Sequence, residues 1–175
     1  MSSFSHHGPW DERSRQNPAL NFIEKYQNIV DSLAFNFVSS TDFFAPFAIY
    51  HDTKGSVHVT GAHIWNWLSQ QFSPFSHVRH ETVTARVVID EDGRDIVYGE
   101  MLTHFRLRGD DEEIVTPRFL VWTLGEAGKG QGMDGRQIYD CKVFWDTGVI
   151  GRYITERKKA ERVKLEKIEA KRLRR

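Results

Sequence analysis

The sequence lacks several features that would direct the protein to particular compartments. Its 175 residues include one cysteine, Cys141, so no intrachain disulfide can form. The first twenty residues lack the apolar run of a secretory signal, and no stretch approaches the ~20 apolar residues that a membrane-spanning helix needs. We therefore expect a cytoplasmic protein with no membrane partner.

A net charge is also lacking. Lysine plus arginine and aspartate plus glutamate number 24 each, so no global field draws the chain onto nucleic acid, and we expect no such partner. The segment 155–175 is the exception, because it carries ten basic and four acidic side chains. We interpret it as a solvated basic helical tail, while docking of this tail on the acidic body of a neighbouring subunit stays open.

Motifs for metals and phosphates are missing as well. His77 and His80 point to opposite faces of one predicted strand, and no cysteine pair assists them, so we expect no metal site. The glycine-rich loop 125–135 lacks the Gly-Lys-Ser/Thr of a phosphate cradle and joins two strands. We therefore expect no cofactor.

What is present suffices for one core, since 39% of the residues are hydrophobic and 13% are aromatic. Residues 1–17 mix serine, histidine, glycine, proline and charged residues without periodicity, which predicts a flexible N-terminal arm. The predicted domain covers 18–154, ahead of the tail at 155–175.

Two amphipathic helices are predicted before the strands. Asn17-Pro18 is a helix-start signature, and apolar spacings of three and four predict a helix that continues to Phe37. A short hairpin, 48–51 with 57–60, precedes a second helix over 61–72, which Pro74 ends.

Four long runs rich in β-branched and aromatic residues follow, joined by turn-forming loops. Long hairpin-linked strands twist and curl, so the preceding helices can fill the concave side. The fold class is therefore α+β, with a cone-shaped curved antiparallel sheet wrapped around the N-terminal helices. The runs are 77–90, 96–108, 113–124 and 137–146.

This order of elements resembles the nuclear-transport-factor-2-like superfamily and, within it, the SnoaL-like polyketide cyclases, over roughly 18–154. The run 138–146, Ile-Tyr-Asp-Cys-Lys-Val-Phe-Trp-Asp, is similar to the family's closing strand I-x-E-x-W-x-Y-W-D, and 47–52 ahead of a hairpin is also family-like. The resemblance implies a cystatin-like α+β roll whose cone holds a small hydrophobic, polyketide- or terpenoid-like ligand. Its implication for function is weaker, because one fold hosts many chemistries.

The resemblance extends to possible catalytic residues. Against the epoxide hydrolases of the superfamily, Met101, Thr103 and Val143 stand where acid, base or arginine side chains are usual, which argues against epoxide hydrolysis. The dehydratases of fungal pigment synthesis resemble this chain in a tyrosine and a histidine, here Tyr50 and His80. A neutral histidine can remove a proton beside a carbonyl that a tyrosine polarises.

Further residues are expected to line the cone. His104 is expected on the strand face opposite Met101 and Thr103, which leaves the second histidine of those dehydratases without a counterpart. Arg118 either binds an anionic group of the ligand or pairs with Glu100 across the strands. The remaining candidate ligand-binding residues are Tyr26, His51, Phe105, Val143 and Trp145.

Two classes of function stay open at this stage. The first is a cofactor-independent isomerase, cyclase or dehydratase with His80 as base and Tyr50 as hydrogen-bond donor. The second is a non-catalytic binding or assembly module with the same fold. In either case large residues on both faces of the long strands predict a homodimer formed through the outer sheet face.

Overall fold

The computed structural model describes residues 3–172, except for the side chains of residues 160, 161, 164, 165 and 167–172. One compact unit extends to Trp145, and a second begins at Asp146. The elements in chain order are β1 Ser3–His7, α1 Glu12–Arg15, α2 Pro18–Asp31, η1 Phe35–Phe37, η2 Ser40–Asp42, β2 Phe44–His51, β3 Val57–Val59, α3 Gly61–Phe72, β4 Phe75–Ile89, β5 Asp95–Leu107, β6 Ile114–Glu126, β7 Arg136–Trp145 and α4 Thr147–Arg172.

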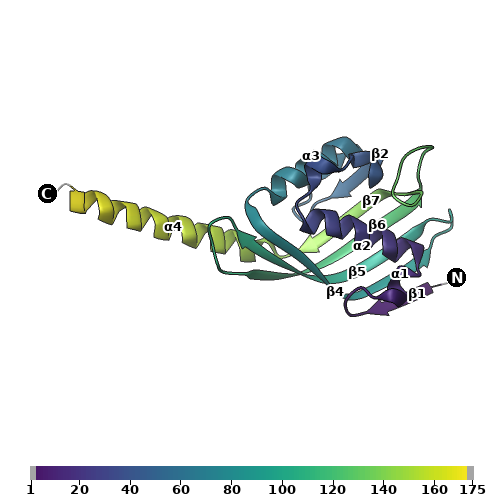
Figure 1. The fold of residues 1–175 in the computed structure, drawn as a ribbon, viewed down its shortest axis with the longest axis horizontal. Coiled ribbons are helices and arrows are strands. Elements are labelled where there is room, and N and C mark those ends of the chain that lie inside the picture. The colour runs from purple at the N-terminus through teal and green to yellow at the C-terminus, as the bar shows by residue number, and fades with distance from the viewer. Residues whose placement is uncertain (1–2, 173–175) are drawn as a thin grey trace. The chain divides into compact units, whose positions relative to one another are not determined.

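The first unit contains a curved, unclosed sheet with the strand order β1-β4-β5-β6-β7-β2-β3 (Figure 1). Strands β4 to β7 form the predicted antiparallel meander. Strand β2 returns along β7 in the parallel direction, so the sheet is antiparallel except for this pair. The α+β fold class is confirmed.

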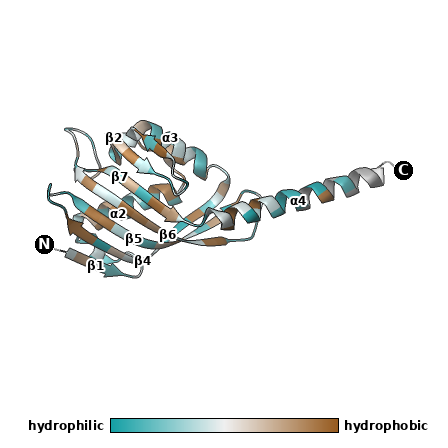
Figure 2. Ribbon diagram, turned by 180° about the vertical axis from the view of Figure 1, so that it is seen from behind, coloured by the Kyte–Doolittle hydropathy of each residue, from teal (hydrophilic) through white to brown (hydrophobic). Residues whose placement is uncertain are grey.

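Helices α2 and α3 supply the layer that covers the sheet. The side chain of Asn17 accepts hydrogen bonds from the backbone N–H groups of Ala19 and Leu20, and Pro18 occupies the first turn, where its missing N–H costs nothing. One face of α2 is buried, and the helix packs against β4 and β5, while α3 packs against β2. Figure 2 shows hydrophobic and hydrophilic residues alternating along the strands, as expected for a sheet with one covered face.

The first helix is shorter than its apolar spacing predicts. Helix α2 ends at Asp31, where Leu33 adopts a positive φ of 54° and breaks the helical path. Two short 3₁₀ turns then lead the chain to β2. The break places Asp31 at the carboxyl end of α2 instead of in the middle of a longer helix.

The segment 1–17, expected to be a flexible arm, is ordered from Ser3 onward. Strand β1 pairs antiparallel with the edge of β4, and His6 is buried and stacks on Trp10. The indole Nε1 of Trp10 donates to Gln27 Oε1 on α2 at 2.9 Å. These long-range contacts order a segment whose local sequence has no periodicity; residues 1 and 2 lie outside the described part of the chain.

The second unit is the helix α4, which begins eight residues before the predicted tail boundary at residue 155. Asp146 closes the turn ahead of it, since its Oδ1 accepts from the N–H of Gly148 at 2.7 Å. Residues 173–175 of the predicted tail lie outside the described residues. Within 3–172, no helix has the length and apolar character to cross a membrane.

Candidate functional site

The concave face of the sheet carries two adjacent rows of side chains that include polar groups. In the first row, His80 of β4 lies opposite Thr103 of β5, which lies opposite Thr116 of β6. The second row runs from β4 to β7 and consists of Thr82, Met101, Arg118 and Trp145. Cross-strand neighbours on one face lie about 5 Å apart, so the rows form one continuous surface.

His80 is held by a carboxylate from α2. Its Nδ1 lies 2.5 Å from Asp31 Oδ1, and its backbone N–H donates to Asp31 Oδ2 at 2.9 Å. A carboxylate accepts, so in the neutral imidazole Nδ1 carries the proton and Nε2 has the free lone pair. No hydrogen bond to Nε2 occurs within residues 3–172, and the side chain is only 7% exposed. A histidine so arranged can act as a general base.

Tyr50 and Tyr26 contribute two buried phenols. Tyr50, on β2, packs against Trp67 with ring centroids 5.2 Å apart, and Tyr26, on α2, contacts Phe43 and Phe44 edge-on. Burial raises the pKa of both hydroxyls well above its usual value. Both therefore stay protonated at neutral pH and can donate a hydrogen bond to an oxygen atom of a ligand.

Arg118 is buried, and no carboxylate among the described residues forms an ion pair with it. Its guanidinium carbon lies 4.0 Å from the ring centroid of Trp145 and 5.0 Å from that of Phe105. Burial lowers the pKa of Arg118 to about 10, so the group is still charged at neutral pH. The expected alternative of an ion pair with Glu100 is wrong, because Arg118 lies opposite Met101, whereas Glu100 lies opposite Phe119 on the outer face.

Several polar atoms on the concave face lack a hydrogen-bond partner among the described residues. Buried polar atoms in proteins are nearly always paired, so a group of unpaired ones requires an explanation. Most belong to the two rows defined above, so they mark the part of the concave face where a ligand would find hydrogen bonds. The atoms are Thr82 Oγ1, Thr103 Oγ1, Thr116 Oγ1, Arg118 Nε and Trp122 Nε1.

The structure places the predicted Tyr26, Tyr50, His80, Met101 and Thr103 on the concave side of the sheet. Phe105, Arg118, Val143 and Trp145 join them there, since they follow the same alternation along β5, β6 and β7.

His51 does not join this set, although it was expected to contact the ligand. It follows Tyr50 on β2 and therefore points to the other face, where its Nε2 lies 3.1 Å from Asp140 Oδ2. The predicted outward direction of His104 agrees with the structure. His104 contacts Glu81 at 3.2 Å and Glu113 at 3.0 Å on the convex face.

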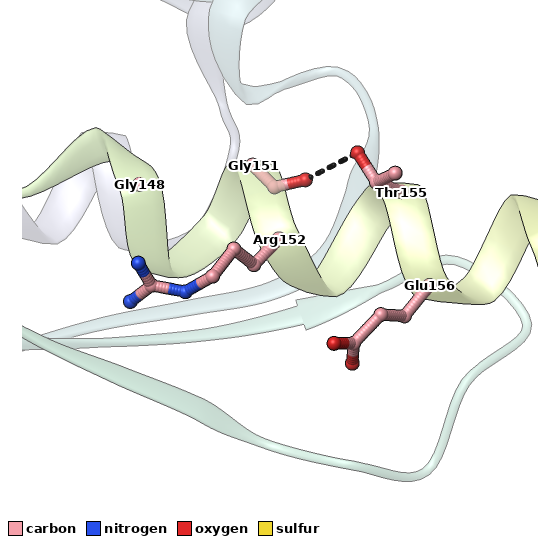
Figure 3. Close-up of a pocket in the computed structure, with 5 residues that line it drawn as sticks. All are labelled: Gly148, Gly151, Arg152, Thr155 and Glu156. Atoms are coloured by element: carbon pink, nitrogen blue, oxygen red, sulfur yellow. Dashed lines mark hydrogen bonds between the residues drawn. The ribbon is translucent and has the colours of Figure 1, made fainter.

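A shallow depression on α4 is a weaker candidate. Figure 3 shows that its lining residues, Gly148, Gly151, Arg152, Thr155 and Glu156, all come from one helix. Thr155 Oγ1 donates to the carbonyl oxygen of Gly151 at 2.8 Å, so its hydroxyl is already used. One side of a single helix cannot enclose a ligand, and we assign the site to the concave face instead.

Sequence reasoning missed Asp31, Thr82 and Thr116. The alternation of side chains along β4 and β6 could have identified the two threonines, because Thr82 shares a face with His80 and Thr116 shares a face with Arg118. No comparable signal existed for Asp31, since it lies 49 residues from His80 and the helix was expected to continue past it.

Comparisons with known proteins support the fold. No family model matches the chain, and no curated protein matches its sequence. Solved structures of low sequence identity are similar, and three of them serve as examples. Aln2 from a Streptomyces species shares 15% identity with a TM-score of 0.60, over 82% of this chain and 99% of that one.

A Catenulispora acidiphila protein with a ketosteroid isomerase-like fold matches at 14% identity and TM-score 0.53, over 73% of this chain and 87% of that one. A putative SnoaL-like polyketide cyclase from Shewanella putrefaciens matches at 13% identity and a TM-score of 0.51, over 84% of this chain and 99% of that one. The fold is thus that of the SnoaL-like and ketosteroid isomerase-like proteins, which confirms the resemblance at the level of the fold.

Proposed function

We propose that the protein is a cofactor-independent acid/base enzyme of the isomerase, cyclase or dehydratase type. Its substrate is a small, largely hydrophobic carbonyl compound held against the concave face of the sheet. The observation that carries the proposal is the His80–Asp31 pair, which orients an imidazole on that face with Nε2 free to accept a proton. The names of the similar proteins, a polyketide cyclase and an isomerase-like fold, agree with this class of chemistry.

The chemistry begins when His80 Nε2 removes a proton from the carbon next to the carbonyl. The electron pair of that C–H bond moves onto the carbonyl oxygen, and the buried hydroxyl of Tyr50 stabilises the resulting enolate by donating a hydrogen bond. The imidazolium, which Asp31 stabilises, then returns its proton. Return to a different carbon is isomerisation, return to a departing hydroxyl is dehydration, and attack of the enolate on a second carbonyl is ring closure.

Exchange of α-protons for deuterium tests the first step without knowledge of the natural substrate. We expect the wild-type protein to accelerate the exchange of 2-tetralone in D₂O, measured by proton NMR. His80→Ala should lower the rate about 100-fold or more, because a positioned general base typically contributes 10²–10⁴. An unchanged rate in this variant, or no acceleration by the wild type, would contradict the proposal.

His77→Ala is the matched control. His77 lies in the same strand as His80, three residues earlier, and therefore points to the opposite face. We expect its exchange rate to equal that of the wild type, while circular dichroism confirms that both variants are folded.

Homodimer formation through the outer sheet face is also part of the proposal. Phe119 and Phe144 lie opposite each other on β6 and β7 and are 42% and 54% exposed, with Tyr98 adjoining Phe119. Exposed aromatic strips of this kind favour association. Light scattering should give a dimer for the wild type and a monomer for Phe119→Glu, whereas Val57→Glu, outside the strip, should stay dimeric.

The predicted cytoplasmic location stays a prediction. Cys141 is buried and free, and burial raises the pKa of its thiol, so it stays protonated and unreactive. A single inert thiol agrees with a reducing compartment.

A further inference from the structure

The charge of Arg118 has no counterpart on the concave face. The side chain is 9% exposed, and its Nε is buried without a hydrogen-bond partner among the described residues. The hydroxyls of Tyr50 and Tyr26 lie near the guanidinium, and neither of them carries a charge at neutral pH. The aromatic faces of Trp145 and Phe105 pack against the guanidinium but accept no in-plane hydrogen bond from its N–H groups.

The polar groups around Arg118 can each donate a hydrogen bond to a ligand, and none of them carries a negative charge. The guanidinium only donates, both phenols keep their protons, and Thr82 in the same row has an unpaired hydroxyl. The one carboxylate known on this side, Asp31, is engaged by His80 through both of its oxygens. A complement to this surface is a group that only accepts and carries a negative charge.

We propose that the molecule bound on the concave face is a carboxylic acid whose carboxylate binds the guanidinium of Arg118. The planar fork of an arginine matches the two oxygens of a carboxylate, and stacking on Trp145 restricts the guanidinium to approach from its edge. No lysine in the described part of the chain acts on Arg118, and a single arginine balances one negative charge, which favours a carboxylate over a phosphate dianion. This inference rests on the proposed function, because it names the class of substrate for the same site.

The sheet geometry limits the length of such an acid. Arg118 lies two strands away from His80 and two residues further along its strand. With strands about 4.8 Å apart and a rise of about 3.4 Å per residue, the two Cα atoms are separated by about 12 Å along the sheet. Both side chains reach inward, so an acid the size of a bicyclic aromatic can contact both.

Calorimetric titration with a matched pair of probes tests the inference. We expect the wild-type protein at pH 7 to bind 2-naphthoate about 10- to 100-fold more tightly than 2-naphthamide, the range typical of a charge-assisted hydrogen bond. Arg118→Gln should remove this preference and leave the affinity for the amide within about threefold, whereas Arg118→Lys should restore part of it, because lysine supplies the charge without the fork.

Arg79→Gln is the control, because Arg79 lies on the outer face beside Glu81 and should leave the preference intact. Equal affinity of the wild type for acid and amide, binding of neither probe, or a preference that survives in Arg118→Gln would overturn the inference. If Arg118→Gln does not fold, Arg118→Lys provides a second test. A lysine variant that prefers naphthoate as strongly as the wild type would contradict recognition by the planar guanidinium.

The outcome for the proposed function is read separately. In His80→Ala we expect the preference for naphthoate to remain while tetralone exchange is lost. Exchange that survives in His80→Ala together with an Arg118-dependent preference would refute the catalytic proposal and leave the acid ligand standing. If exchange is lost in His80→Ala but no Arg118-dependent preference for naphthoate is found, the acid ligand is refuted and the catalytic proposal stands.

Discussion

Replacing Arg118 by methionine exchanges a buried charge for an apolar side chain of similar length. Burial lowers the pKa of this guanidinium from its ordinary value to about 10, which corresponds to about 3 kcal/mol by which the interior disfavours the charged form. Stacking on Trp145 offsets about 1–2 kcal/mol of that cost. We therefore expect Arg118→Met to increase the free energy of unfolding by about 1–2 kcal/mol, within the range seen when buried charges are replaced by apolar side chains.

The assay is urea unfolding followed by tryptophan fluorescence and circular dichroism. A gain of this size raises the melting temperature by about 2–8 °C in a chain of this length. Arg86→Met, at an exposed position on the outer face of β4, should change the stability by less than about 0.5 kcal/mol. A loss of more than about 1 kcal/mol in Arg118→Met, with an unchanged m-value, would refute the view that the charge is kept at a cost to stability.

The pH dependence of this difference has a definite sign. The pKa of Arg118 is lower in the folded protein than in the unfolded chain, so from about pH 10 up to the ordinary pKa of arginine the unfolded chain binds more protons. The wild type therefore gains stability relative to Arg118→Met as the pH rises through this window. We expect the difference in the free energy of unfolding between Arg118→Met and the wild type to be constant near neutral pH and to become smaller above about pH 10.

Two further predictions concern the carboxylates that contact histidines. Asp31→Asn should lower tetralone exchange about 100-fold or more while leaving the calorimetric affinity for naphthamide unchanged. The single amide oxygen cannot accept from both the backbone N–H and the Nδ1–H of His80, so the tautomer with a free Nε2 is no longer held; equal loss of binding and exchange would contradict a positioning role. On the outer face, the hydrogen bond to His104 lowers the pKa of Glu113 below 4.5, so this contact stabilises the fold above that pH and is lost in acid. Glu113→Gln should be less stable than the wild type by urea unfolding at pH 7 but not at pH 3.

The parts of the fold that could be predicted from the sequence are those with a local signal. Alternation along 96–108 placed Met101, Thr103 and Phe105 on one face and His104 on the other, and the structure agrees. The turn residues between the long runs indicated the meander for the same reason, since a hairpin is specified by a few neighbouring residues.

The parts that escaped depend on contacts between distant residues. Strand β1 is mostly polar and short, and contacts with distant residues, such as its pairing with β4 and the bond from Trp10 to Gln27, make it part of the fold. The contact of Asp31 with His80 requires the chain to leave the helix at Leu33, a position where a left-handed backbone for a leucine is unfavourable by itself. Tertiary packing therefore overrides local preference at the residue that completes the candidate base.

Substitution of the two threonines of the first row can distinguish a role in core packing from a role in ligand binding. Thr103 and Thr116 lie opposite each other, are fully buried, and have hydroxyls without a partner in the described part of the chain. An unpaired buried hydroxyl costs about 1–3 kcal/mol, so Thr103→Val combined with Thr116→Val, which removes two of them, should raise the free energy of unfolding by about 2–6 kcal/mol. Thr84→Val is the control that should lose stability, because its hydroxyl donates to the carbonyl oxygen of His6 at 3.2 Å.

The double variant should also lose affinity for the substrate that these hydroxyls are proposed to bind. With 2-tetralone as the probe, we expect weaker binding by calorimetry and slower exchange, even though the protein is more stable. A core under selection for stability alone would contain valine at both positions, so a gain in stability coupled to a loss of binding identifies them as part of the site. A double variant that is destabilised as much as Thr84→Val would show instead that the hydroxyls are paired, and the argument from unpaired polar atoms would fail.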